Sequence, residues 1–192
     1  MLGCANPALK HLRQGDSYSN QKLWDEAIIE YSKAIELDPG FAIAYSKRGT
    51  AYNMKELYDL AIADCNKAIL LDPNYANAYS VRSHAFLSVG QYELAFADCN
   101  KAIELGPNLA IAYVYRAYVY LSQEQYEPAI ADCNKAILLD PNLAEVYWNR
   151  SLAYKALGEK SKAIADIEKF ITLTDNPQWI EMAEQEIEEL SR

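Results

Sequence analysis

Three nine-residue segments of this chain are nearly identical: AIADCNKAI at Ala61–Ile69, AFADCNKAI at Ala95–Ile103 and AIADCNKAI at Ala129–Ile137. Each segment begins 34 residues after the one before it. The same interval separates the four prolines Pro39, Pro73, Pro107 and Pro141. An internal period of this length indicates a repeat architecture, in which each 34-residue repeat buries its apolar face against its neighbours.

Each repeat contains two apolar stripes of helical spacing. In the second repeat, the first stripe consists of Tyr45, Gly49 and Tyr52, and the second consists of Ala61, Cys65 and Ala68. A polar bend at Lys55–Glu56 separates the stripes. Pro73 closes the repeat, because proline cannot continue a helix. The pattern predicts a helix, a turn, a second helix and a second turn.

The repeats resemble tetratricopeptide repeats. That family has a 34-residue helix–turn–helix repeat that reads aromatic-x2-Leu-Gly-x2-Tyr, then Ala-x3-aromatic, then Pro. The second repeat of this chain reads Tyr45-x2-Arg48-Gly49-x2-Tyr52, then Ala61-x3-Cys65, then Pro73. The resemblance implies an all-α fold, a right-handed superhelical solenoid of antiparallel helix pairs. Small residues stand where the paired helices are expected to cross: Gly15, Gly49, Ser83, Ala117 and Ser151.

The period also predicts the organisation of the chain. We expect an N-terminal tail at 1–7, five repeats over 8–177 and a solvating capping helix at 178–192. The repeats are 8–41, 42–75, 76–109, 110–143 and 144–177. Asn6 and Pro7 form a helix start. Beyond Pro177, one apolar stripe covers the last repeat, and it consists of Trp179, Ala183, Ile187 and Leu190.

Composition and charge exclude several classes of protein. The chain has 192 residues and is 51% hydrophobic, which excludes disorder. Its net charge of −9 argues against a nucleic-acid partner. No apolar run approaches the length of about 18 residues that a membrane span requires. Fifteen of its aromatic residues are tyrosine, and most of these occupy repeating positions.

The cysteines indicate packing and a reducing compartment. Cys65, Cys99 and Cys133 recur on equivalent helices about 8–10 Å apart, too far for a disulfide or a shared metal ion. We expect them to be buried free thiols, which fits a cytoplasmic location. The alternative is a lipid-anchored or periplasmic protein, if Cys4 follows a removed lipoprotein signal. No metal or cofactor is expected, and His11 and His84 lack the partners of a catalytic site, so we expect no enzyme.

Arginine and aspartate recur together. The arginines are Arg48, Arg82, Arg116 and Arg150, and the aspartates are Asp64, Asp98, Asp132 and Asp166. The first repeat lacks both and carries Gln14 and Glu30 instead. We therefore predict an arginine–aspartate pair inside each of the last four repeats. The alternative is that the charges are independent and solvated.

The resemblance implies that the first helices line a concave groove, which in this family holds a peptide or helix of a partner. The lining changes along the chain, being small and polar in repeats two and three and aromatic in repeats four and five. The candidate binding residues are Asn53, Asn77, His84, Val114, Tyr115, Tyr118, Trp148, Asn149 and Leu152. Exposed aromatics favour a site in the C-terminal half.

The function that the sequence predicts is a non-catalytic scaffold that binds a protein or peptide ligand in this groove. The alternative is a structural module that forms a homo-oligomer through the apolar C-terminal half. One branch of the family clamps a chaperone carboxylate with lysine, asparagine and arginine. This chain departs from that pattern, because Leu12 and Asp16 stand in place of the first lysine and asparagine.

Overall fold

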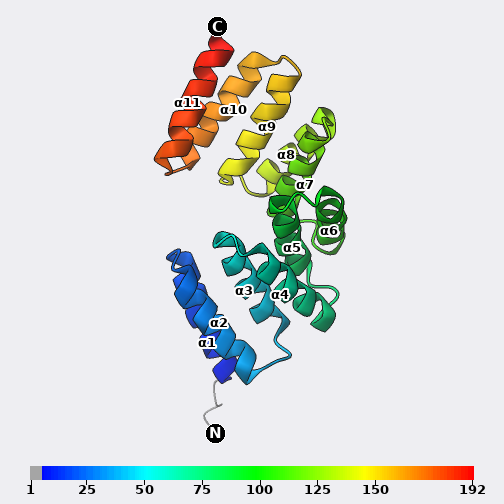
Figure 1. Cartoon of the computed structure of the whole chain (residues 1–192). Helices are drawn as coiled ribbons and strands as arrows, with labels where there is room; N and C mark the ends of the chain where they lie inside the picture. The colour runs from blue at the N-terminus through cyan, green and yellow to red at the C-terminus, as the bar shows by residue number, and fades with distance from the viewer. Residues whose placement is uncertain (1–5) are drawn as a thin grey trace. The chain divides into compact units, whose positions relative to one another are not determined.

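The structure, a computed structural model, describes residues 6–192, and Figure 1 shows the chain. Cys4, on which the lipoprotein alternative rests, lies outside the described residues. The described residues form eleven α-helices and no strand, which confirms the all-α fold. The chain divides into two compact units, Met1–Gly106 and Pro107–Arg192.

Each unit is a stack of helix pairs, and in the second unit the single helix α11 packs on the last pair. The first unit contains α1 (Pro7–Asn20), α2 (Trp24–Leu37), α3 (Ala42–Met54), α4 (Tyr58–Leu71), α5 (Ala76–Ser88) and α6 (Tyr92–Leu105). The second contains α7 (Ala110–Ser122), α8 (Tyr126–Leu139), α9 (Ala144–Ala156), α10 (Lys160–Leu173) and α11 (Pro177–Ser191). Within each unit, the first helices of successive repeats also pack on each other, α3 on α5 and α7 on α9.

The expected helix start at Asn6 and Pro7 is present, and α11 begins in the same way. The side chain of Asn6 accepts a hydrogen bond from the backbone N–H of Ala8 at 3.0 Å, with Pro7 in the first turn of α1. Asn176 caps α11 in the same way, and its side chain accepts from Gln178 N–H at 3.0 Å. An asparagine at this position satisfies backbone donors that have no partner inside the helix.

The turn inside each helix pair has one residue in the left-handed region. Residues with positive φ recur every 34 positions: Lys22 (59°), Glu56 (60°), Gly90 (75°), Glu124 (57°) and Gly158 (76°). Glycine adopts this conformation readily, whereas a residue with a Cβ atom is strained there. The backbone of the turn is therefore the same in all five repeats, although only two of them have glycine.

The paired helices approach most closely at the predicted small residues, all of which are buried. A Cβ atom added to Gly49 would lie 3.1 Å from Cys65 Sγ. In the first repeat the space is tighter, because a Cβ atom on Gly15 would lie 2.5 Å from a ring carbon of Tyr31. The first repeat thus combines the smallest residue with the largest partner.

An arginine–aspartate pair joins the two helices of each of the last four repeats, as predicted. Arg48 Nε and Nη2 donate to the two carboxylate oxygens of Asp64 at 2.7 and 2.8 Å. Arg82–Asp98, Arg116–Asp132 and Arg150–Asp166 have the same two-pronged geometry. The aspartates are buried, and the hydrogen bonds to them raise the pKa of the Arg48 and Arg150 guanidiniums.

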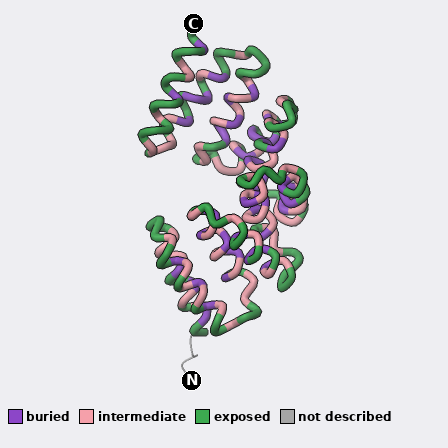
Figure 2. Tube along the Cα trace, viewed as in Figure 1, coloured by how far each residue is buried: buried purple, intermediate pink, exposed green. Residues whose placement is uncertain are grey.

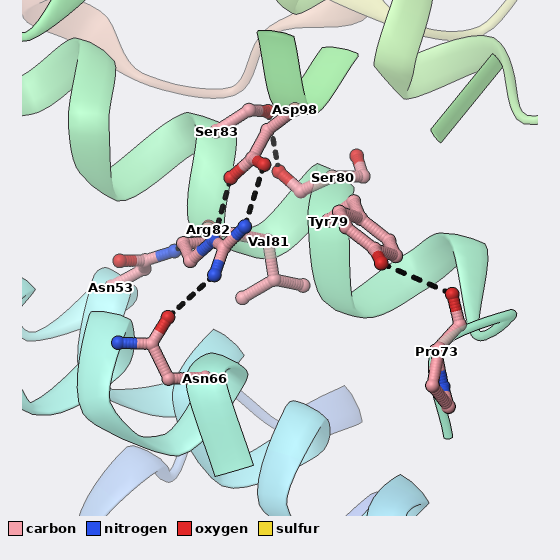
Figure 3. Close-up of polar contacts among 9 residues, drawn as sticks. All are labelled: Asn53, Asn66, Pro73, Tyr79, Ser80, Val81, Arg82, Ser83 and Asp98. Carbon is pink, nitrogen blue, oxygen red and sulfur yellow. Dashed lines mark hydrogen bonds and ion pairs between the residues drawn. The ribbon is translucent and has the colours of Figure 1, made fainter. Parts of the chain in front are cut away.

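The same guanidinium also contacts aromatic rings and the preceding repeat. Arg82 lies 5.7 Å from the ring centroids of both Tyr79 and Phe86. Its Nη1 donates to Asn66 Oδ1 of the second repeat, as the close-up in Figure 3 shows. Arg48 donates to Ser32 and Arg150 donates to Asn134 in the same manner. The arginine therefore links helices within a repeat and between successive repeats of one unit.

The first repeat uses a different pair at the same place. His11 Nδ1 lies 2.6 Å from Glu30 Oε2. In this repeat a histidine on α1, instead of an arginine, therefore joins the two helices. Glu30 occupies the repeat position of Asp64. The bond to His11 is the main reason that the pKa of Glu30 lies below its usual value, and Lys33 contributes further.

Part of the tyrosine content follows from a hydroxyl contact at the end of the repeats. Tyr79 donates its hydroxyl proton to the carbonyl of Pro73 at 3.0 Å, which Figure 3 also shows. Tyr113 and Tyr147 donate to Pro107 and Pro141 at 3.1 Å. A phenylalanine would pack equally well but would leave these carbonyls without this donor.

We predict a measurable coupling between Arg116 and Asp132. Each single substitution to alanine leaves a largely buried charge without its partner, whereas the double variant removes both charges. A double-mutant cycle by urea denaturation is expected to give about 1–3 kcal/mol of coupling. A coupling near zero would show that the two charges act independently and would contradict the paired geometry.

We also predict that the first repeat accepts a larger residue at position 15 only when its neighbour shrinks. Gly15→Ala is expected to lower the free energy of unfolding by about 1–3 kcal/mol, because the added methyl group collides with the Tyr31 ring. In a Tyr31→Cys background the same substitution should be nearly neutral, because that variant reproduces the Ala117 and Cys133 pair of the fourth repeat. Equal costs in both backgrounds would rule out the collision.

Candidate functional site

The first unit has a polar pocket between its first two repeats. The pocket has a volume of about 310 Å³ and is lined by Asp16, Ser19, Asn20, Tyr31, Lys47 and Thr50. Lys47 Nζ lies 2.8 Å from Asp16 Oδ1, and the Tyr31 hydroxyl donates to the same oxygen at 2.9 Å. Burial and the Asp16 carboxylate raise the pKa of Tyr31, so its hydroxyl stays protonated. The pocket is therefore an internally paired polar site.

Two of the candidate asparagines bind the protein's own backbone. Asn53 Nδ2 donates to the carbonyl of Val81 at 2.8 Å, which joins α3 to α5 (Figure 3). Asn149 Nδ2 donates to the carbonyl of Val114 at 3.3 Å, which joins α9 to α7. Both side chains are buried. They hold neighbouring first helices together.

These positions require a correction to the sequence-based set. Asn53, Val114 and Asn149 retain 4%, 2% and 6% of their surface, so none of them is accessible to a ligand. The reason is the close packing of successive first helices, which covers positions that a single helix would leave open. Val114 is buried on α7, and its carbonyl is bound by Asn149 of α9, so these three residues do not form a ligand surface.

The other candidate binding residues of the first unit differ in how far their side chains are buried. Asn77 is exposed at the start of α5, and His84 is half-buried further along the same helix. Burial lowers the pKa of His84 below the ordinary value. A neutral imidazole in this setting contributes packing more than charge.

The second unit presents the aromatic candidates. Tyr118 on α7 is 44% exposed, and Trp148 and Leu152 on the adjacent α9 are partly exposed. We call the surface formed by Tyr118, Trp148 and Leu152 the Tyr118 face. Tyr115, on the same helix as Tyr118, is also partly exposed. Figure 2 shows buried and intermediate positions along the helices of the second unit.

Trp148 is also part of the packing of the second unit. Its ring centroid lies 5.3 Å from that of Phe170 on α10, and Phe170 lies 6.2 Å from Trp179 on α11. The expected apolar stripe of α11 is buried at Ala183 and Leu190, but Trp179 remains 45% exposed. Sequence reasoning assigned Trp179 to the covered stripe, and the structure places it at the edge of that stripe.

The chemistry of the described residues is that of a packed scaffold. Cys65, Cys99 and Cys133 are buried free thiols, as expected, and burial raises the pKa of Cys133 to about 12. Within residues 6–192, no group of three or more His, Cys, Asp or Glu side chains could hold a metal ion. None of the helices in that part of the chain is both long and apolar enough to cross a membrane.

Comparison with known families agrees with the helix-pair geometry. Models of the tetratricopeptide repeat match residues 15–56, 42–75, 76–109 and 117–188. The chain belongs to the tetratricopeptide repeat family. No curated protein matches the chain.

Several solved structures are similar to this chain. The crystal structure of MamA is 28% identical, with 82% of this chain and 92% of that chain covered and a TM-score of 0.64. The first repeat domain of Spaghetti (RPAP3), bound to the HSP90 peptide SRMEEVD, is 29% identical, with coverages of 64% and 98% and a TM-score of 0.59. TTC0263, a repeat protein of Thermus thermophilus, has a TM-score of 0.79 at 18% identity, with coverages of 93% and 97%.

We predict that His84 makes the stability of the protein depend on pH. Because the folded state lowers its pKa, the folded chain binds a proton less readily than the unfolded chain, in which histidine titrates near 6.5. The free energy of unfolding should therefore fall as the pH drops through that value, and it should fall less in His84→Gln. Urea denaturation above and below this pH measures the difference. An identical pH dependence in both proteins would contradict the prediction.

Proposed function

We propose that this chain is a non-catalytic scaffold that binds a segment of a partner protein on the Tyr118 face. The observation that carries the proposal is the exposure of Tyr118 beside two further apolar side chains on the adjacent helix, Trp148 and Leu152. Adjacent exposed aromatic and aliphatic side chains are typical of binding surfaces, where a few such residues supply most of the affinity.

The position of Tyr118 in the repeat supports this reading. The equivalent positions of the second and third repeats carry Thr50 and His84. No packing requirement of the period therefore calls for a tyrosine at this place. On α7, the recurring Tyr113 and Tyr120 contact Arg116, and Tyr113 also donates to the carbonyl of Pro107, whereas Tyr118 makes neither contact.

The polar pocket of the first unit is the weaker candidate. Its carboxylate already accepts bonds from Lys47 and from the Tyr31 hydroxyl, so a ligand there would have to replace satisfied contacts. An apolar ligand on the Tyr118 face would instead remove exposed apolar surface from water, which is favourable.

Peptide binding in a similar protein agrees with the proposal. The first repeat domain of Spaghetti binds the peptide SRMEEVD. By analogy, we infer that the first helices of this chain also present a surface for a protein segment. The residues of the Tyr118 face are apolar, so we expect a ligand of different composition from that acidic peptide.

Tyr118→Ala is expected to weaken binding of the partner about tenfold or more, which is the loss typical of a central interface aromatic. Leu138→Ala provides a matched control, because Leu138 is 77% exposed but lies on α8 outside the Tyr118 face. Partners captured by the wild-type chain should be measured against both variants, with folding checked by circular dichroism. Equal binding by Tyr118→Ala and Leu138→Ala would refute the assignment of the face.

Self-association through the same apolar surface is the alternative function. Sedimentation velocity over a range of concentrations distinguishes the two. A monomer at all concentrations favours a foreign ligand. A dimer that Tyr118→Ala dissociates and Leu138→Ala leaves intact would favour the alternative.

A further inference from the structure

The Tyr118 face continues onto the capping helix. Trp148 of α9 and Trp179 of α11 both contact the ring of Phe170 between them. Lys155 of α9 forms an ion pair with Glu186 of α11 at 2.5 Å, so the two helices are joined at a second point. Figure 1 shows α9, α10 and α11 together in the second unit.

The capping helix adds exposed apolar surface at this edge. Trp179 and Met182, one helical turn apart, are 45% and 44% exposed. At helical spacing they share a flank of α11 with Glu186 and Glu189. Because Glu186 binds Lys155, this flank faces the side of α9 that carries the Tyr118 face. The exposed apolar residues of the extended face are thus Tyr118, Trp148, Leu152, Trp179 and Met182.

The charge around this surface is negative. Lys155, near the end of α9, is paired with Glu186. Glu145 on α9 and Glu189 on α11 are exposed, and in the part of the chain that the structure describes neither has an ion-pair or hydrogen-bond partner. An incoming segment therefore meets apolar rings bordered by unpaired carboxylates.

We propose that the segment bound here is basic as well as apolar: a stretch of a partner protein in which bulky apolar side chains alternate with lysine or arginine. The inference rests on the proposed function, because it names the class of ligand for the same face. Apolar side chains of the ligand cover Tyr118, Met182 and the exposed parts of the two tryptophans. Its cations lie beside Glu145 and Glu189, where opposite charge speeds association and excludes acidic partners.

Trp179 gives the cations a second favourable contact. A guanidinium or ammonium group over an indole ring is attracted by the negative face of the ring, and tryptophan is the strongest partner of this kind. An acidic segment would gain neither interaction and would be repelled by the unpaired carboxylates.

The test is a selection from a phage-displayed library of random peptides by the full chain, followed by affinity measurements on the enriched peptides. Intrinsic fluorescence reports binding directly in a Trp24→Phe background, since the two remaining tryptophans, Trp148 and Trp179, both belong to the extended face. We expect the enriched peptides to carry net positive charge and large apolar residues. Their affinity should fall about tenfold in Glu145→Lys/Glu189→Lys.

The matched control is Glu127→Lys/Glu168→Lys, which changes the net charge equally on the exposed surfaces of α8 and α10. Its affinity should stay within about twofold of wild type. Enrichment of neutral or acidic peptides, or equal losses in the two charge-reversed variants, would overturn the inference. If those peptides still lose affinity in Tyr118→Ala, the proposed function stands. If no peptide is enriched over a Tyr118→Ala chain, the proposed function fails too.

Discussion

In each of the last four repeats, the pairing of the two helices depends on the ion pair between an arginine and an aspartate. The guanidinium lies largely out of water, and a charge in that position is costly unless all its donors find partners. Asp64 and its equivalents take two of them, and Ser32, Asn66 or Asn134 takes another within a unit. Within a unit, this requirement fixes the aspartate, the flanking aromatic rings and the second helix of the preceding repeat in one geometry. A hydrophobic pair could hold two helices together, but it would not select a single register between them so strictly.

The demands of this scaffold also define where function can reside. Positions that recur every 34 residues are occupied by packing, by the charge pair or by the tyrosine-to-proline bonds. Side chains outside these series are not needed for the packing of the repeats. Among them, Tyr118, Trp179 and Met182 leave apolar surface exposed. The second unit thus separates structural residues from candidate binding residues more clearly than the first, where the exposed polar groups of the pocket already pair with one another.

The period made the fold, the helix crossings and the arginine–aspartate pairs predictable, because each of these depends on spacing along one or two adjacent helices. The exposure of single positions was less predictable. Val114 and Asn149 would be open on an isolated helix, yet the neighbouring first helix covers them. Trp179 fits the apolar stripe of α11 by spacing, but its large ring extends past the surface that α10 can cover. The pocket around Lys47 depends on the Tyr31 hydroxyl reaching Asp16, a contact between helices that no periodicity encodes.

The ion pair between His11 and Glu30 makes the contact between α1 and α2 sensitive to acid. In the other four repeats the cation of the pair is an arginine, which keeps its charge at every physiological pH, whereas in the first repeat Glu30 pairs with a histidine. The pKa of Glu30 is lowered in the folded chain, so the stability gained from its carboxylate is present at neutral pH and is lost as the pH falls through that lowered value. Acid therefore weakens the contact that joins α1 to α2.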